Sequence, residues 1–128
     1  LLCIDDDRDF SAALASRLRR YGIGVLNAFD GADGYRQAFL QPAAAIILDY
    51  NMPNGQGDYV LRRLQETPIT KDIPVIVLTG NRDTTIRRTM LNLGASAFLF
   101  KPPQFEKLLE ELARFVKLAP IDEPAPTP

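Results

Sequence analysis

Short apolar runs alternate along the chain with segments in which apolar and polar residues are mixed. Most of these runs are apolar at every position, not at every second one, which is typical of strands buried on both faces of a parallel sheet. We therefore predict five strands. They lie at residues 1–4, 25–29, 44–48, 75–78 and 97–100, the second being the weakest.

The segments between these runs have the spacing of amphipathic helices. Phe10, Leu14 and Leu18 recur at intervals of four residues in the first segment, as do Leu108 and Leu112 in the last. Such intervals place side chains on one face of a helix. The middle segments repeat the pattern over shorter stretches, around residues 35–39, 60–64 and 86–93. The alternation predicts an α/β domain of (βα)5 type, a doubly wound fold with a five-stranded parallel sheet.

Glycine and proline mark the predicted boundaries. Gly22 and Gly94 follow helical segments, at the position where a left-handed residue commonly ends a helix. Pro74 precedes the fourth strand, and Pro102 with Pro103 separates the fifth strand from the last helix. These signals agree with the five strand–helix units.

The length of 128 residues suits one domain with its own core. The helical pattern ends at Leu118, so we assign residues 1–118 to the domain. Residues 119–128 are proline-rich and acidic, which predicts a linker or disordered tail. Because Leu1 already lies inside an apolar run, we expect the native N-terminus to lie further upstream.

The charge balance and the single cysteine limit the possible partners. The formal net charge of −1 gives no basic excess, so we expect no direct binding of nucleic acid by this segment. No apolar run approaches the roughly 20 residues of a membrane span, so we expect no membrane association. Cys3 has no partner for a disulfide, which fits a cytoplasmic protein.

Polar residues that could take part in binding or catalysis follow four of the predicted strands. Asp5 and Asp6 follow the first, Asp49 the third, Thr79 the fourth and Lys101 the fifth. In open parallel sheets, ligands bind beyond the carboxyl ends of the strands. If the strand order is 2-1-3-4-5, these four strands are neighbours, and their terminal residues line one crevice.

Each of these residues has an ordinary structural explanation when it is taken alone. Asp7 is best explained as a helix N-cap, Asp49 could be a turn residue, and Lys101 could be a solvated surface lysine. Three carboxylates in one crevice, however, repel one another unless a cation lies among them. Oxygen ligands in a chain without histidine favour Mg²⁺ over softer metals. A lysine and a threonine beside the metal would complete a site for a phosphoryl group.

Taken together, these stretches resemble the receiver domains of two-component response regulators, the CheY-like superfamily, over residues 1–117. The resemblance is carried by residues 1–7 (LLCIDDD), 46–53 (IILDYNMP) with Gly57, 74–80 (PVIVLTG) and 94–102 (GASAFLFKP). It implies a flavodoxin-like fold with strand order 2-1-3-4-5. It also implies a phosphorylation-activated signalling switch that catalyses only its own phosphorylation and dephosphorylation.

The resemblance assigns a role to each residue of the crevice. Asp49 would be the phosphoacceptor, and Asp6, Asp49 and the backbone carbonyl of Asn51 would bind Mg²⁺, with Asp5 supporting the metal through water. Thr79 would hydrogen-bond the phosphoryl group and Lys101 would pair with another of its oxygens. Phe98 would be the aromatic switch residue. In many receiver domains the peptide bond after the lysine is cis, and here that bond is Lys101–Pro102.

The resemblance also implies the partners. The phosphoryl donor would be a sensor histidine kinase, a phosphotransfer protein or a small phosphodonor. An output domain or a second protomer would bind the face formed by the fourth helix, the fifth strand and the fifth helix, where we expect Arg87, Arg88 and Lys107 to be exposed.

Two other functions remain open from the residues alone. The first is a docking module of the same fold that is never phosphorylated, which the absence of Asp49 or Lys101 would have favoured; both are present. The second is a phosphatase-like enzyme with an aspartyl nucleophile. Such enzymes usually carry a second acid two residues beyond the nucleophile, and that position is Asn51 here, so we rank this function last.

Overall fold

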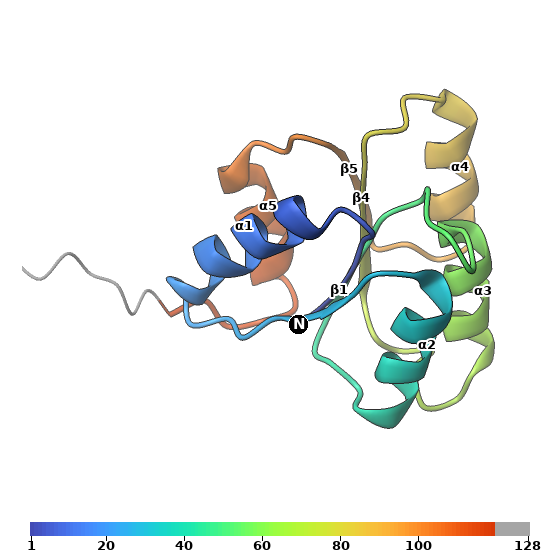
Figure 1. The fold of residues 1–128 in the computed structure, drawn as a ribbon, viewed down its shortest axis with the longest axis horizontal. Coiled ribbons are helices and arrows are strands. Elements are labelled where there is room, and N and C mark those ends of the chain that lie inside the picture. Colours follow the sequence, from blue (N-terminus) through green and yellow to red (C-terminus); the bar gives the residue numbers. More distant parts are fainter. Residues whose placement is uncertain (120–128) are drawn as a thin grey trace, which may run out of the picture.

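The computed structural model describes residues 1–119 and shows strands and helices in strict alternation (Figure 1). In chain order the elements are β1 (Leu2–Ile4), α1 (Arg8–Arg19), β2 (Leu26–Ala28), α2 (Gly31–Leu40), β3 (Ile46–Leu48), α3 (Gly57–Glu66), β4 (Val75–Thr79), α4 (Thr84–Asn92), β5 (Ala97–Phe100) and α5 (Phe105–Ala113). The linker or tail predicted at 119–128 lies, apart from Ala119, outside the described residues.

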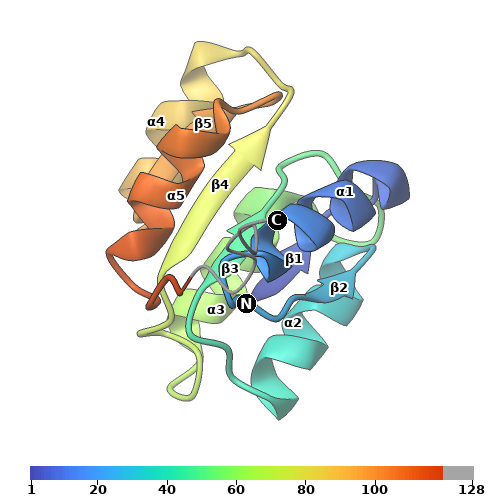
Figure 2. The same cartoon turned by 90° about the vertical axis from the view of Figure 1, so that its left-hand side faces the viewer.

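The strands form one parallel sheet in the order β2-β1-β3-β4-β5, which confirms the predicted topology (Figure 2). The register aligns the ends of the inner strands, because Ile4 lies opposite Leu48 and Leu48 lies opposite Val77. The residues that follow β1 and β3 are therefore side by side at one edge of the sheet.

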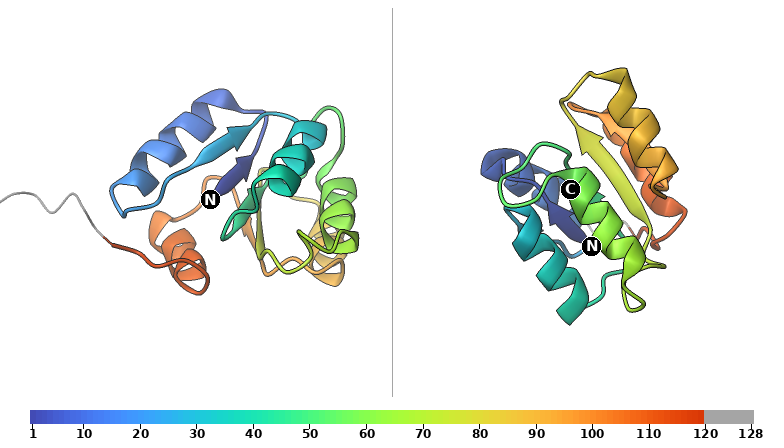
Figure 3. Two further views of the ribbon diagram at one scale, coloured as in Figure 1. Left: turned by 90° about the horizontal axis from the view of Figure 1, so that it is seen from below. Right: turned by 90° about the vertical axis from the view of Figure 1, so that its right-hand side faces the viewer.

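Helices cover both faces of the sheet. α1 and α5 lie on one face, and α2, α3 and α4 lie on the other (Figures 1 and 3). Successive strand residues point to opposite faces. Accordingly, Ile47 and Ile76 pack in the cluster beneath α1 and α5, whereas Leu48 and Val77 pack beneath the other three helices. The core thus has two halves, one on each side of the sheet.

Burial separates the inner strands from the edge strands. Every residue of β1, β3 and β4 is buried, as the unbroken apolar runs predict. The prediction is wrong for the edges: all four residues of β5 are half-buried, and Leu26 in β2 is 49% exposed. An edge strand has a neighbouring strand on one side only, so its other side stays open to solvent.

The ends of the elements follow their sequence signals. The Asp7 side chain accepts a hydrogen bond from the Phe10 N–H at 3.0 Å and caps α1, which confirms its assignment as an N-cap. Gly22 and Gly94 have φ angles of 78° and 110°, the left-handed region predicted for them. The Lys101–Pro102 peptide bond is cis. Among the described residues, no helix is long and apolar enough to cross a membrane.

Candidate functional site

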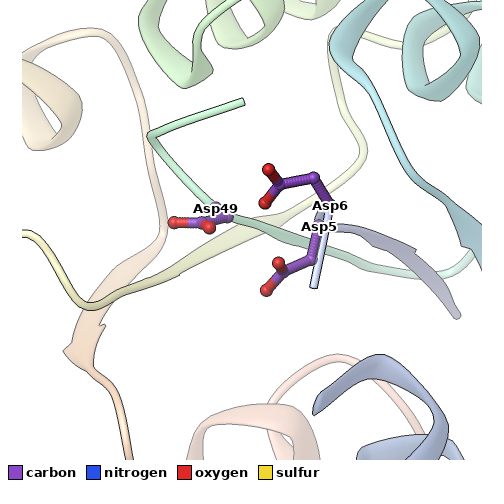
Figure 4. Close-up of side chains that lie close together, drawn as sticks. All are labelled: Asp5, Asp6 and Asp49. Carbon is purple, nitrogen blue, oxygen red and sulfur yellow. The ribbon is translucent and has the colours of Figure 1, made fainter. Parts of the chain in front are cut away.

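Three carboxylates meet at the carboxyl edge of the sheet. Asp5 and Asp6 follow β1, Asp49 follows β3, and their side chains extend to the same side of the strand tips (Figure 4). One carboxylate oxygen of each lies within 4.8 Å of the others. Asp5 and Asp49 are buried, at 1% and 6% exposed, whereas Asp6 is exposed. The cluster is therefore two buried carboxylates with a third at the solvent boundary.

Lys101 reaches into this cluster from the end of β5. Its Nζ lies 2.6 Å from Asp5 Oδ2 and 3.3 Å from Asp49 Oδ2. Burial raises the pKa of Asp5, and the close ion pair with Lys101 counteracts part of that rise. Burial lowers the pKa of Lys101, but the close ion pair with Asp5 and the charge of Asp49 outweigh it, so the pKa of Lys101 is raised overall. The ammonium is thus held in its charged form between the two carboxylates.

Backbone groups fix the two buried carboxylates. The Asp49 N–H donates to Ile4 O at 3.0 Å, which continues the pairing of β1 with β3. One carboxylate oxygen of each residue accepts from the main chain: Asp49 Oδ1 from the Tyr50 N–H at 2.7 Å and Asp5 Oδ1 from the Asp7 N–H at 2.9 Å. These bonds hold both side chains before any ligand arrives.

Thr79 and Lys101 complete one wall of a cleft of about 470 Å³ above the cluster. Thr79 is the last residue of β4 and is 1% exposed. The residues that line the cleft are Asp6, Asp7, Asp49, Asn51, Thr79, Gly80, Asn81 and Lys101. Five of the predicted site residues line the cleft. Asp5 lies buried beneath Lys101, and Phe98 lies within β5, away from the cleft.

Phe98 lies away from the cleft, in the outermost strand. Its ring packs edge to face against Phe100, with centroids 5.4 Å apart, and it contacts the core beneath α4. Its backbone lies opposite Val77, two residues before Thr79 on β4. Phe98 therefore lies two residues back from the ends of β4 and β5, which border the cleft.

Asn81 is a cleft residue that was not predicted from the sequence. Its side-chain Nδ2 donates to Asn51 Oδ1 at 2.8 Å, and its backbone N–H donates to the Thr79 hydroxyl at 3.2 Å. Asn81 thereby joins the loops that follow β3 and β4. One feature of the sequence could have indicated it: Asn81 lies two residues beyond Thr79, a predicted site residue at the end of a strand.

The donor set fits a hard divalent cation. The three clustered carboxylates offer oxygen ligands, and Mg²⁺ prefers such ligands while keeping part of its water shell. Lys101 already occupies Asp5 Oδ2. The carboxylates of Asp6 and Asp49, which face the open cleft, are therefore the better-placed ligands.

Residues 1–113 match the family described as the response regulator receiver domain. Among curated proteins, the transcriptional regulatory protein PrrA of Mycobacterium tuberculosis is 38% identical over 102 residues, 80% of this chain and 43% of PrrA. The response regulator MprA of Mycobacterium leprae is 31% identical over 125 residues, 98% of this chain and 54% of MprA. The chain thus spans about half the length of these relatives.

Solved structures with the same fold include the chemotaxis protein CheY4 of Vibrio cholerae, with a TM-score of 0.81 and 27% identity over 90% of this chain and 96% of that one. The receiver domain of sensor histidine kinase PA1611 from Pseudomonas aeruginosa also has a TM-score of 0.81 and 27% identity, covering 89% of this chain and 93% of that one. The PA1611 receiver domain has a magnesium ion coordinated in its active-site cleft.

Proposed function

The chain belongs to the response regulator receiver domain family, and from that premise we propose that it is a signalling switch activated by transfer of a phosphoryl group to Asp49. Receiver domains are modules of two-component signalling and interact with histidine kinases. The observation that carries the proposal is the setting of Asp49: a nearly buried carboxylate that lines an open cleft, with the Lys101 ammonium 3.3 Å away.

Asp49 would act as the nucleophile of an in-line displacement. One of its oxygens forms a bond to phosphorus while the bond from phosphorus to the donor breaks, and the electron pair of that bond leaves with the donor. Lys101 faces the negative charge of the transferring oxygens, and the buried Thr79 hydroxyl at the cleft wall donates a hydrogen bond to one of them. The protein's contribution is position and electrostatics.

Mg²⁺ would be held by Asp6, Asp49 and the backbone carbonyl of Asn51, with Asp5 acting through water, and it would supply positive charge against the phosphoryl oxygens. All four residues fit this role by position. Asp6, Asp49 and Asn51 line the cleft, and Asp5 lies beneath it with its carboxylate in the cluster.

We further propose that the donor is a sensor histidine kinase or a phosphotransfer protein, with a small phosphodonor as substitute, and that the chain works in the cytoplasm without contacting nucleic acid itself. The output face would be α4, β5 and α5. Arg87, Arg88 and Lys107 are exposed on these helices and could meet an output domain or a second protomer. As the protein would act only on its own carboxylate, its catalysis would be limited to its own phosphorylation and dephosphorylation.

The direct test is labelling with acetyl phosphate and Mg²⁺, followed by intact-mass spectrometry. The wild-type chain should gain one acid-stable, base-labile phosphoryl group, and Asp49→Asn should gain none. Asp72→Asn removes an exposed carboxylate outside the cleft and should label like the wild type. Equal labelling of Asp49→Asn and wild type would refute the acceptor, and failure of the wild type to label would favour the unphosphorylated docking module.

A further inference from the structure

Lys101 lies just beyond the last residue of β5, where the regular hydrogen bonding of the sheet ends. Its backbone N–H still donates to Thr79 O at 2.9 Å. The next residue is Pro102, which has no N–H to continue the ladder. A main-chain carbonyl at such a point takes its donor from a side chain or from water. Arg82 supplies it: its Nη2 donates to Lys101 O at 3.0 Å.

Arg82 also covers the residue before Lys101. Its guanidinium carbon lies 4.6 Å from the centre of the Phe100 ring, within the range of a cation–π contact. A planar guanidinium can stack on a ring and donate from its edge at the same time, which a lysine ammonium cannot do. One side chain of the loop between β4 and α4 therefore contacts two successive residues at the end of β5.

The same loop is tied on its other side by Asn81, whose side chain donates to Asn51 on the loop after β3. The end of β5 is consequently linked through Arg82 to a loop that is itself anchored across the cleft. Both backbone polar groups of Lys101 are held from the β4 side, the N–H by Thr79 and the carbonyl by Arg82.

We propose that Arg82 is a positioning residue for Lys101. Acting through the Lys101 carbonyl and the Phe100 ring, it fixes the backbone from which Nζ reaches Asp5 at 2.6 Å and Asp49 at 3.3 Å. Arg82 itself does not line the cleft. The inference rests on the proposed function, because its consequence is a slower transfer of the phosphoryl group when Lys101 is misplaced.

The experiment compares labelling rates with acetyl phosphate and Mg²⁺ in Arg82→Ala, Arg82→Lys and Arg62→Ala, with amide NMR spectra of each variant. Arg62 is exposed on α3 and serves as the control for the loss of one surface charge. Since a displacement of about 1 Å can cost a hundredfold in rate, Arg82→Ala is expected to label roughly tenfold more slowly than wild type. Arg82→Lys keeps the charge but loses the planar guanidinium, so its labelling rate should lie between those of Arg82→Ala and wild type. Arg62→Ala should label at the wild-type rate.

The amide signals of Phe100 and Lys101 should shift in Arg82→Ala and stay in place in Arg62→Ala, and Mg²⁺ affinity should be unchanged because Arg82 contacts none of the three carboxylates. The inference is overturned if Arg82→Ala labels at the wild-type rate. It is also overturned if Arg82→Lys labels at the wild-type rate, because the charge of residue 82 would then be enough to explain the slower labelling of Arg82→Ala through attraction of the anionic donor. If the wild type takes no label, the proposed function fails, and unmoved Phe100 and Lys101 signals would separately refute the positioning role.

Discussion

At the scale of single residues, the site is a cluster of three carboxylates, two of which contact one ammonium. Lys101 lies between Asp5 and Asp49, so the buried pair has a counter-charge within the protein. Asp6 has the exposed carboxylate of the three. A cluster with more negative than positive groups favours the entry of a divalent cation, and Asp6 is where that cation would meet the protein first.

Replacing Asp6 by asparagine removes one negative charge and one strong ligand from the proposed metal site. We expect Mg²⁺ affinity to fall by on the order of tenfold, which corresponds to about 1.4 kcal/mol. Isothermal titration calorimetry at fixed ionic strength measures the change. Asp9→Asn removes an exposed charge in the first turn of α1 and should leave the affinity as it is. Equal affinities of Asp6→Asn and wild type would remove Asp6 from the ligand set.

The residues of the site differ in how far the sequence could predict them. Asp5, Asp6, Asp49, Thr79 and Lys101 were predictable because each ends an apolar strand or follows one within two residues, and parallel strands end at one edge. The close pairing of Lys101 with Asp5 was not, because side-chain reach across two strands depends on exact packing. Arg82 and Asn81 lie in a loop without periodicity, so no pattern pointed to their contacts.

At the scale of elements, the start of α2 packs closely against the loop that carries Asn51. The Gly31 N–H donates to Pro53 O at 3.2 Å. A Cβ atom at Gly31 would collide with the Gly55 carbonyl and would approach Val60 Cγ2 to 2.8 Å. This contact leaves no room for a side chain, so it holds the loop after β3 against α2.

Gly31→Ala should therefore destabilise the fold by about 1–3 kcal/mol, because the added methyl group overpacks a backbone contact. Gly24→Ala is the matched control, since a Cβ there meets no atom within 4 Å. It should be neutral or stabilising by up to about 1 kcal/mol through the unfolded chain. Urea denaturation followed by circular dichroism gives both values. A midpoint for Gly31→Ala equal to that of Gly24→Ala would contradict the close packing.

The elements themselves were well predicted where burial is complete. β1, β3 and β4 lie within a residue or two of their apolar runs. The partial exposure of β2 and β5 could not be read from the runs, because apolar residues occur in edge and inner strands alike. Which strand becomes an edge is decided by topology, a property of the whole sheet and not of any one segment.

At the scale of the whole molecule, the cleft and the proposed output face meet where β4, which ends at the cleft, pairs with β5, which belongs to the output face. Thr79 lies opposite Phe100, and Phe98 lies opposite Val77, so a movement at the end of β4 acts directly on the strand that carries Phe98. Phe98 is half-buried, and its ring packs edge to face against Phe100. We expect a phosphoryl group on Asp49 to draw the Thr79 hydroxyl toward it and to let the Phe98 ring turn inward.

This coupling predicts amide chemical-shift changes from Gly80 to Lys101 when beryllofluoride and Mg²⁺ are added. The shift in population should be incomplete, with a coupling of about 1–3 kcal/mol. Thr79→Ala should still take up the ligand but lose the response along β5, and Phe98→Tyr should fold normally. Changes confined to the surroundings of Asp6 and Asp49 in the wild type would contradict the route.

The two ends of the described chain meet at the connection between α1 and β2. The amino group of Leu1 donates to Gly24 O at 3.1 Å, and the Ala119 N–H donates to Tyr21 O at 2.8 Å. This connection lies at the edge of the sheet where the strands begin, opposite the cleft. Residues 1 and 119 therefore lie at the same connection, and a short bridge between them would allow a circular permutant to be opened at another exposed connection. The cleft, at the far edge, would keep all of its residues in such a rearranged chain.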